Sequence, residues 1–230
     1  MTRYNTSIAT SGAPISTISR RAYNLLAFGM VTLSFLVMWG TYLLAGGSAV
    51  NGIIANLGAV GTLGLLIGSL AGSIVGIVLM GQGKAKQKVG LSVAGYALFS
   101  LTFGFTIAMA LQRYELGTIY YAFGITACLS GIFLVAGVVF PEFFARIGRV
   151  LVLSLLAVVL VELVATIFFH ANQTIFDYIV VIIFCGLLGY DSYKLAADEP
   201  TVPNAVYNAS QIYVDIANIL IRVLDILDHR

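Results

Sequence analysis

Six long apolar runs constrain what this chain can fold into more than any other feature of its sequence. Each is about 20 residues or longer, which is the length that a helix needs to cross the hydrocarbon core of a bilayer. The runs predict membrane-spanning helices near residues 23–45, 53–81, 89–111, 117–140, 149–169 and 175–194.

The composition supports an integral membrane protein and excludes several other classes. Only 10% of the 230 residues are charged and 60% are hydrophobic, whereas soluble domains carry about 25% charged residues. The net charge of +2 includes no basic face that could neutralise phosphates, so nucleic acid is not an expected partner. Cys128 and Cys185 lie inside apolar runs, which favours core residues over a disulfide or a metal site. Because no hydrolase signature is present, we expect neither an enzyme nor a cofactor.

The distribution of lysine and arginine predicts the orientation of the chain. Residues 1–20 are polar and rich in Ser and Thr, so we expect a disordered tail before a single transmembrane domain over residues 21–230. If the N-terminus is cytoplasmic, the opposite side receives only Arg113, as the positive-inside rule requires. The cytoplasmic side then receives Arg3, Arg20, Arg21, Lys84, Lys86, Lys88, Arg146, Arg149 and Lys194.

A seventh helix, predicted near residues 204–227, differs from the other six. Its polar residues recur at steps of three and four, which places them on one helical face. Because six apolar spans surround it, we expect this stripe to face a wet or hydrogen-bonded axis, with Leu220 and Val223 as candidates for lipid contact. The alternative is an interfacial helix that lies on the membrane surface. The stripe consists of Tyr207, Gln211, Asp215, Asn218, Arg222 and Asp225.

An aspartate at the end of the sixth run suggests a proton switch. In GLLGYDSYKLAADEP, Asp191 lies about one turn before the cytoplasmic end of its span. The chain reverses through residues 196–203, and at about 1.5 Å per residue Asp215 can return to a similar depth. Two neighbouring carboxylates in a medium of low dielectric cannot both ionise cheaply. We therefore hypothesise that Asp191 and Asp215 share a proton and titrate as a pair.

Other interpretations of these charged residues remain open at this point. Asp191 can instead contact lipid headgroups and Lys194, while Asp215 pairs with Arg222. Glu162, inside the fifth span, either lines an ion path from the outer side or hydrogen-bonds a neighbouring backbone group.

The end of the chain resembles the closing signature of the Bax inhibitor family, the transmembrane Bax inhibitor motif proteins. The resemblance rests on YDSYKL (190–195) and on the aspartate of YVDIANILIRVLDIL (213–227), 24 residues after Asp191. It extends over residues 21–230. It implies an all-α integral membrane fold, a seven-helix bundle with six spans around a central polar last helix. It also implies pH-dependent passage of Ca²⁺ down its gradient, with Asp191 and Asp215 as the family's paired aspartates.

The resemblance also implies a latch on the first aspartate. Bacterial members of the family carry an arginine at the cytoplasmic end of the second span that can hold this aspartate. The best match here is Lys86, with Lys84 and Lys88 as neighbours. A lysine lacks the bidentate fork of arginine, so the latch should be weaker.

These features support two classes of function. The first is a pH-sensitive calcium leak in a bacterial plasma membrane, in which Asp191 and Asp215 form a weak Ca²⁺ site with backbone carbonyls and water. Its partners would be Ca²⁺, protons and the lipid bilayer. The alternative is a non-transporting regulator that binds other membrane proteins, such as a quality-control protease, with residues 1–20 as a docking segment.

Overall fold

The computed structural model describes residues 16–46, 48–169 and 174–228, and within these ranges the chain forms seven α-helices. Their lengths agree with the predicted spans, and the six helices that precede the last are each long and apolar enough to cross a membrane. The helices are α1 (Arg20–Ala45), α2 (Ser48–Ala85), α3 (Val89–Leu111), α4 (Leu116–Val139), α5 (Pro141–Phe169), α6 (Thr174–Ala197) and α7 (Val202–Asp228).

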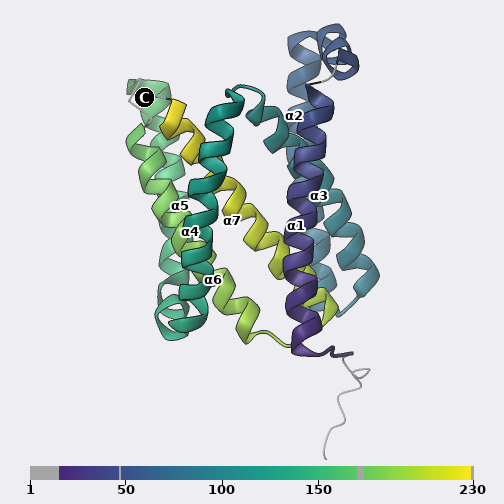
Figure 1. Cartoon of the computed structure of the whole chain (residues 1–230), viewed down its shortest axis with the longest axis vertical. Helices are drawn as coiled ribbons and strands as arrows, with labels where there is room; N and C mark the ends of the chain where they lie inside the picture. Colours follow the sequence, from purple (N-terminus) through teal and green to yellow (C-terminus); the bar gives the residue numbers. More distant parts are fainter. Residues whose placement is uncertain (1–15, 47, 170–173, 229–230) are drawn as a thin grey trace, which may run out of the picture.

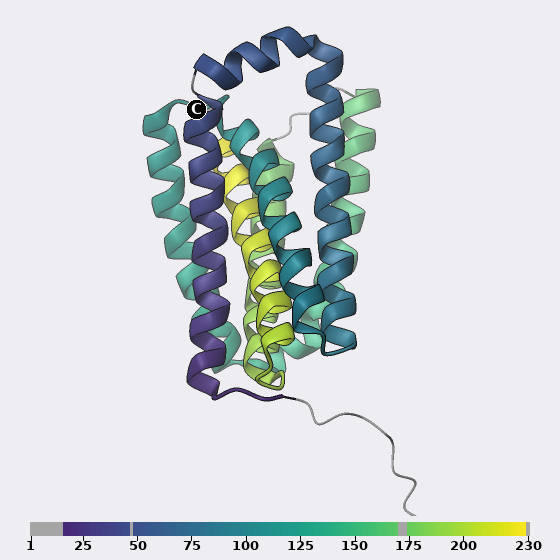
Figure 2. The ribbon, with the colours of Figure 1, turned by 90° about the vertical axis from the view of Figure 1, so that its right-hand side faces the viewer.

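The seventh helix lies at the centre of the bundle. It packs against α1, α2, α3, α4 and α6 (Figure 1), and it runs between them along the length of the bundle (Figure 2). The fifth helix lies outside this group and packs on α6. The predicted seven-helix bundle with a central polar last helix is therefore confirmed, except that α5 lies outside the helices that surround α7. The interfacial alternative for the last helix is wrong.

Most residues of the last helix are buried, which corrects one expectation. Leu220 is 0% exposed and Val223 is 5% exposed, so neither contacts lipid. The apolar positions of α7 pack against the surrounding helices, while several of its polar positions, such as Asn208 and Arg222, bind polar side chains of other segments. Because the neighbours shield it from lipid, α7 does not need the hydropathy of a lipid-facing span.

Two predicted spans begin at different residues. Gly58 has a φ of 64°, a conformation that side-chain-bearing residues rarely adopt, and it divides α2 into two segments. The first segment lies across the end of the bundle (Figure 2), so the span predicted near 53–81 begins only after this kink. The fifth span was predicted near 149–169, but α5 begins at Pro141 because proline is well tolerated in the first turn.

Residues 16–20 have a defined place, although they belong to the segment predicted to be a disordered tail. The Ile18 amide donates to the carbonyl oxygen of Pro200 at 2.8 Å, and Thr17 forms a bridge with Thr201. The Ser19 side chain then caps α1 by accepting from the Ala22 amide. Residues 1–15 of the predicted tail lie outside the described residues.

The segment of α6 that carries Asp191 is held by close helix packing. A Cβ atom added at Gly137 of α4 would collide with the backbone carbonyl of Gly189, and one added at Gly189 would collide with the ring of Phe144. Small residues allow helices to approach this closely in membrane proteins. The backbone two residues before Asp191 is thus fixed against both α4 and α5.

We call the end of the bundle at which α1 and α7 begin and α6 ends the basic end, and the opposite end the far end. The helix order places the connections α2–α3, α4–α5 and α6–α7 at the basic end. Arg20, Lys84, Arg149 and Lys194 lie toward this end.

Candidate proton and cation site

The structure brings Asp191 of α6 and Asp215 of α7 together. Their exposed fractions are 8% and 5%, and their carboxyl groups lie within hydrogen-bonding reach of each other. The second oxygen of Asp215, Oδ2, is buried without a hydrogen-bond partner among the described residues. A buried carboxylate oxygen without a partner is costly. Asp215 Oδ2 is therefore an acceptor atom that a proton or a cation can bind.

One cation lies beside the pair. Lys194 Nζ is 2.8 Å from Asp191 Oδ1, one turn along the same helix, and it also lies over the ring of Tyr190. A contact between Asp191 and Lys194 was one half of the alternative interpretation, in which the two aspartates do not act as a pair. The other half of that alternative, a pair between Asp215 and Arg222, is not formed, because Arg222 binds two other carboxylates.

The predicted latch residues are arranged differently from the expectation. Lys84 is the lysine of α2 that binds a carboxylate, and its partner is Asp198 in the α6–α7 connection, with Lys84 Nζ 2.6 Å from Asp198 Oδ2. Lys86 and Lys88 are exposed in the turn that follows α2. Of these three lysines, Lys84 lies within α2, which ends at Ala85, and its ammonium group faces Tyr207 of α7.

Asp198 is the centre of a hydrogen-bonded cluster at the basic end. Asn208 of α7 donates to Asp198 Oδ2 at 2.8 Å and to the Tyr23 hydroxyl at 3.0 Å. Burial alone would raise the pKa of Asp198, but the hydrogen bonds from Lys84 and Asn208 outweigh it and hold the pKa below its ordinary value. The cluster joins α1, α2 and α7 through a carboxylate that stays ionised at neutral pH. We call it the Asp198 cluster.

A second charged cluster lies toward the far end, and we call it the Arg222 cluster. The guanidinium of Arg222 binds Glu162 of α5 through two bonds of 2.8 and 3.0 Å and Asp177 of α6 through one of 2.6 Å. The side chains of Glu162 and Asp177 are 14% and 2% exposed. Glu162 therefore forms an ion pair, which neither of its two interpretations anticipated. Nearby, the Tyr114 hydroxyl donates to Asp225.

Sequence reasoning missed Asp177 and Asp198. Asp177 stands in the first turn of the sixth span, where the same rule that singled out Glu162 would have found it. Asp198 gave no comparable signal, because acidic residues are ordinary in the connections between spans.

The polar stripe of α7 contacts its neighbours at several levels. Tyr207 lies under the Lys84 ammonium, Asp215 meets Asp191, and Asn218 donates back to the Val214 carbonyl oxygen of its own helix. Gln211 is partly buried between the first two levels. Asp215 is therefore the buried member of the stripe, whereas its other five residues are partly buried.

The donor set at the aspartate pair suits only weak cation binding. Two carboxylates supply at most four oxygens, whereas Ca²⁺ takes six to eight. Within residues 16–46, 48–169 and 174–228 no group of three or more His, Cys, Asp or Glu side chains is placed to hold a metal ion. Backbone carbonyls and water would have to supply the remaining ligands.

Comparison with known proteins identifies the family. The chain is 25% identical over 236 residues to the inner membrane protein YbhL of Escherichia coli K12, a match that covers 97% of this chain and 96% of that protein. It is equally similar to the protein of the same name in Escherichia coli O6:H1. An uncharacterized protein of Borreliella burgdorferi is 29% identical over 60% of this chain and 64% of its own length. No solved structure matches the chain significantly. The sequence pattern of the family described as "Inhibitor of apoptosis-promoting Bax1" matches residues 15–230, so the chain belongs to the Bax inhibitor family.

Proposed function

We propose that this protein is a pH-sensitive leak for cations, chiefly Ca²⁺, that works without catalysis or a resident cofactor. The observation that carries the proposal is the Asp191–Asp215 pair, in which a buried oxygen of Asp215 lacks a partner. The pair joins α6 to α7, the helix around which the bundle is built. A change in its charge therefore acts on the packing of the whole bundle.

The charged groups around the pair determine how much positive charge is required to balance the two carboxylates. Lys194 of α6 is the cation that faces Asp191, and Tyr190, Tyr207 and Cys185 are the other titratable groups close to the site. If both aspartates ionise, Lys194 balances one charge and the other is left in a medium of low dielectric. A shared proton or a bound cation removes this excess charge.

This balance gives the expected dependence of flux on pH. With both carboxylates ionised, the site holds Ca²⁺ more tightly than after protonation and releases it more slowly, whereas conduction requires weak binding. One proton on the pair weakens binding, so flux should rise as the pH falls through roughly 8 to 6. At lower pH both carboxylates become neutral and no longer attract a cation, so flux should decline again.

We also propose that the protein resides in a bacterial plasma membrane with its basic end toward the cytoplasm. Lysine and arginine gather at this end, and the relatives from Escherichia coli are named inner membrane proteins. A cysteine introduced by Lys86→Cys, in a background without Cys128 and Cys185, should react with an impermeant thiol reagent only after the membrane is permeabilised. Labelling of intact cells would reverse the proposed orientation.

Flux measurements in liposomes loaded with a Ca²⁺ indicator test the proposed function. Asp191→Asn and Asp215→Asn keep the size of each side chain but cannot titrate, so each should abolish the pH dependence between pH 5 and 8. The double variant should resemble either single variant, because two groups that act as one switch are not additive. Glu199→Gln, an exposed carboxylate in the α6–α7 connection, is the matched control and should keep the wild-type profile.

Two results would contradict the proposal. An unchanged pH profile in both single variants would leave the pair as a structural contact between α6 and α7. No Ca²⁺ flux from the wild-type protein at any pH would favour the alternative, a regulator that binds other membrane proteins.

A further inference from the structure

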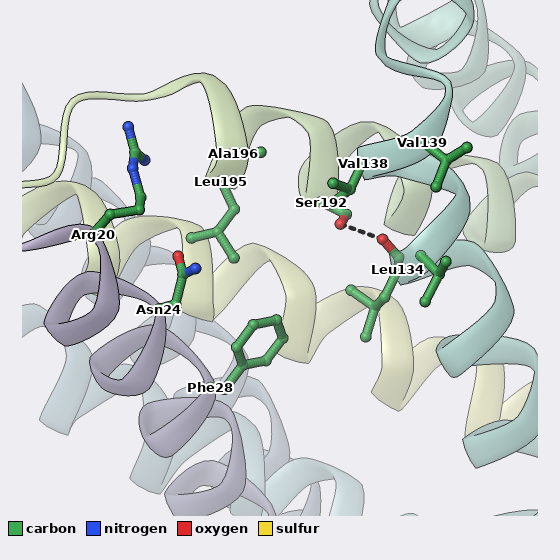
Figure 3. A pocket seen from close by; sticks show the side chains of 10 residues that line it. Arg20, Asn24, Phe28, Leu134, Val138, Val139, Ser192, Leu195 and Ala196 are labelled. Atoms are coloured by element: carbon green, nitrogen blue, oxygen red, sulfur yellow. Dashed lines mark hydrogen bonds between the residues drawn. The ribbon is translucent and has the colours of Figure 1, made fainter.

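A groove of about 550 Å³ opens between α1 and α4 at the basic end (Figure 3). Its α1 wall presents Arg20, Asn24 and Phe28, its α4 wall includes Val135 and Val138, and Leu195 of α6 lies at its floor. In Figure 3 the α1 and α4 side chains line opposite sides of the space, and the guanidinium of Arg20 lies at one end of it. The groove is separate from the aspartate pair, which does not line it.

The side chains of the α1 wall become less polar with distance from the basic end. Arg20, Asn24 and Phe28 are spaced by four residues, so they follow one face of the helix at steps of about 6 Å. A charge stands at the helix end, an amide one turn further in, and an aromatic ring one turn beyond that. The opposite wall is apolar throughout. This order matches a ligand with an anionic head, a polar neck and a hydrocarbon tail.

The charge of Arg20 is free to bind an anion. Its Nη1 donates to the backbone carbonyl oxygen of Asp198 at 2.9 Å, and the guanidinium lies over the Tyr23 ring at 5.3 Å. None of the ion pairs among the described residues includes Arg20, because the Asp198 carboxylate binds Lys84 instead. The contacts fix the position of the guanidinium without neutralising it. Its remaining N–H groups suit the oxygens of a phosphate.

The groove continues as a seam along the bundle. Two smaller grooves follow the boundary between α1 and α4, both lined by Phe35 and Phe123, and one of them reaches Ile216 and Leu220 of α7. Figure 1 shows α7 behind the boundary between α1 and α4. An acyl chain that enters beside Phe28 therefore finds apolar surface over much of the depth of the bilayer.

We propose that the groove is a binding site for an acidic phospholipid. The headgroup phosphate binds Arg20, the ester region lies near Asn24, and one acyl chain lies between Phe28 and Val138. Basic pockets between membrane helices at the positively charged side are suited to acidic headgroups. Each buried CH₂ group of the chain adds to the binding free energy, so the apolar walls supply affinity while Arg20 supplies preference for charge.

Native mass spectrometry of the delipidated full-length chain tests this proposal. The probes are phosphatidylglycerol and phosphatidylethanolamine with identical acyl chains, added separately at matched concentrations. The wild-type protein should bind one molecule of phosphatidylglycerol about fivefold more tightly, the ratio expected for one basic residue beside a headgroup of net negative charge. Phosphatidylethanolamine carries the same phosphate, but its ammonium group cancels the negative charge and is repelled by Arg20. Arg20→Gln should remove this preference, and Arg20→Lys should retain part of it.

Two further variants separate a built site from diffuse attraction. Arg21→Gln removes the same charge one residue along, from a side chain that does not line the groove, and should leave the preference unchanged. Val138→Trp fills the groove and should weaken binding of both lipids. Elution and helical content equal to those of the wild type would show that each variant is folded.

Several outcomes would overturn the proposal. An equal loss of preference in Arg20→Gln and Arg21→Gln would indicate general surface charge. Unchanged binding in Val138→Trp would place the lipid elsewhere, and equal binding of the two lipids by the wild type would exclude a site that selects an acidic headgroup. A dimer that Val138→Trp disrupts would assign the groove to a second copy of the chain.

Discussion

The Arg222 cluster and the Asp191–Asp215 pair are two solutions to one problem, that of holding two carboxyl groups inside a membrane bundle. Each includes one residue of α7, Arg222 or Asp215, and these two residues are seven positions or about 10 Å apart along the helix. In the Arg222 cluster a planar cation stands between Glu162 and Asp177 and binds both. In the pair the carboxyl groups face each other, and the nearby cation, Lys194, contacts only Asp191.

The difference indicates which cluster holds the fold and which one responds to pH. An arginine remains protonated at any physiological pH, so the Arg222 cluster keeps its bonds when the pH changes. The aspartate pair has no such cation between its members and depends on a proton or a metal ion. The far half of α7 is therefore attached permanently to α5 and α6, whereas its attachment at Asp215 is conditional.

The largest expected effect comes from breaking the permanent cluster. Arg222→Gln leaves the buried carboxylate of Asp177 and the partly buried carboxylate of Glu162 without their cation, which should lower the free energy of unfolding by about 3–5 kcal/mol. Asp215→Asn removes a charge that forms no ion pair with any described residue and should change stability by less than about 1 kcal/mol at pH 8. Thermal unfolding of both variants in the same detergent measures the contrast.

A triple variant provides the control for this contrast. Glu162→Gln and Asp177→Asn, added to Arg222→Gln, remove the unpaired charges and should recover most of the lost stability. Equal destabilisation by Arg222→Gln and Asp215→Asn would contradict the division between a permanent and a conditional cluster.

The Asp198 cluster sharpens the comparison, because it is an acidic site that should not respond near neutral pH. Its pKa lies below the ordinary value of about 3.9. A lowered pKa means that the contribution to stability is fully present above the unfolded value and is lost as the pH falls through the folded value. Asp198→Asn should therefore lower stability by about 1 kcal/mol, equally at pH 5 and pH 8.

Flux and unfolding together check this expectation. The Asp198→Asn protein should keep the wild-type pH profile of Ca²⁺ flux, although it unfolds at a lower temperature. If Asp198→Asn shifts the pH profile of Ca²⁺ flux, the Asp198 cluster takes part in the pH response in the same way as the aspartate pair.

The sequence predicted the parts of this arrangement that follow from periodicity and hydropathy. Six spans and the polar face of α7 are local patterns, and the proximity of Asp191 and Asp215 followed from helix rise across one short connection. The partner of each charge did not follow, because it depends on how helices distant in sequence are rotated against one another. Glu162 lies 60 residues before Arg222, and no local pattern links them. The bend at Gly58 was equally hidden, because α2 contains several other glycines, of which Gly72, Gly76 and Gly83 pack closely on α3.

The choice between Lys86 and Lys194 gives the last and smallest expected effect. Lys86→Gln alters an exposed side chain in a turn and should leave both stability and the flux profile unchanged, within about 0.5 kcal/mol for stability. Lys194→Gln removes the cation that contacts Asp191, so the pair should keep its proton to higher pH and the flux maximum should move toward alkaline pH. Flux profiles of the two variants from pH 5 to 9 measure the difference. A shift with Lys86→Gln and none with Lys194→Gln would restore the latch that the family resemblance implied and would show that Asp191 changes partners as the bundle opens.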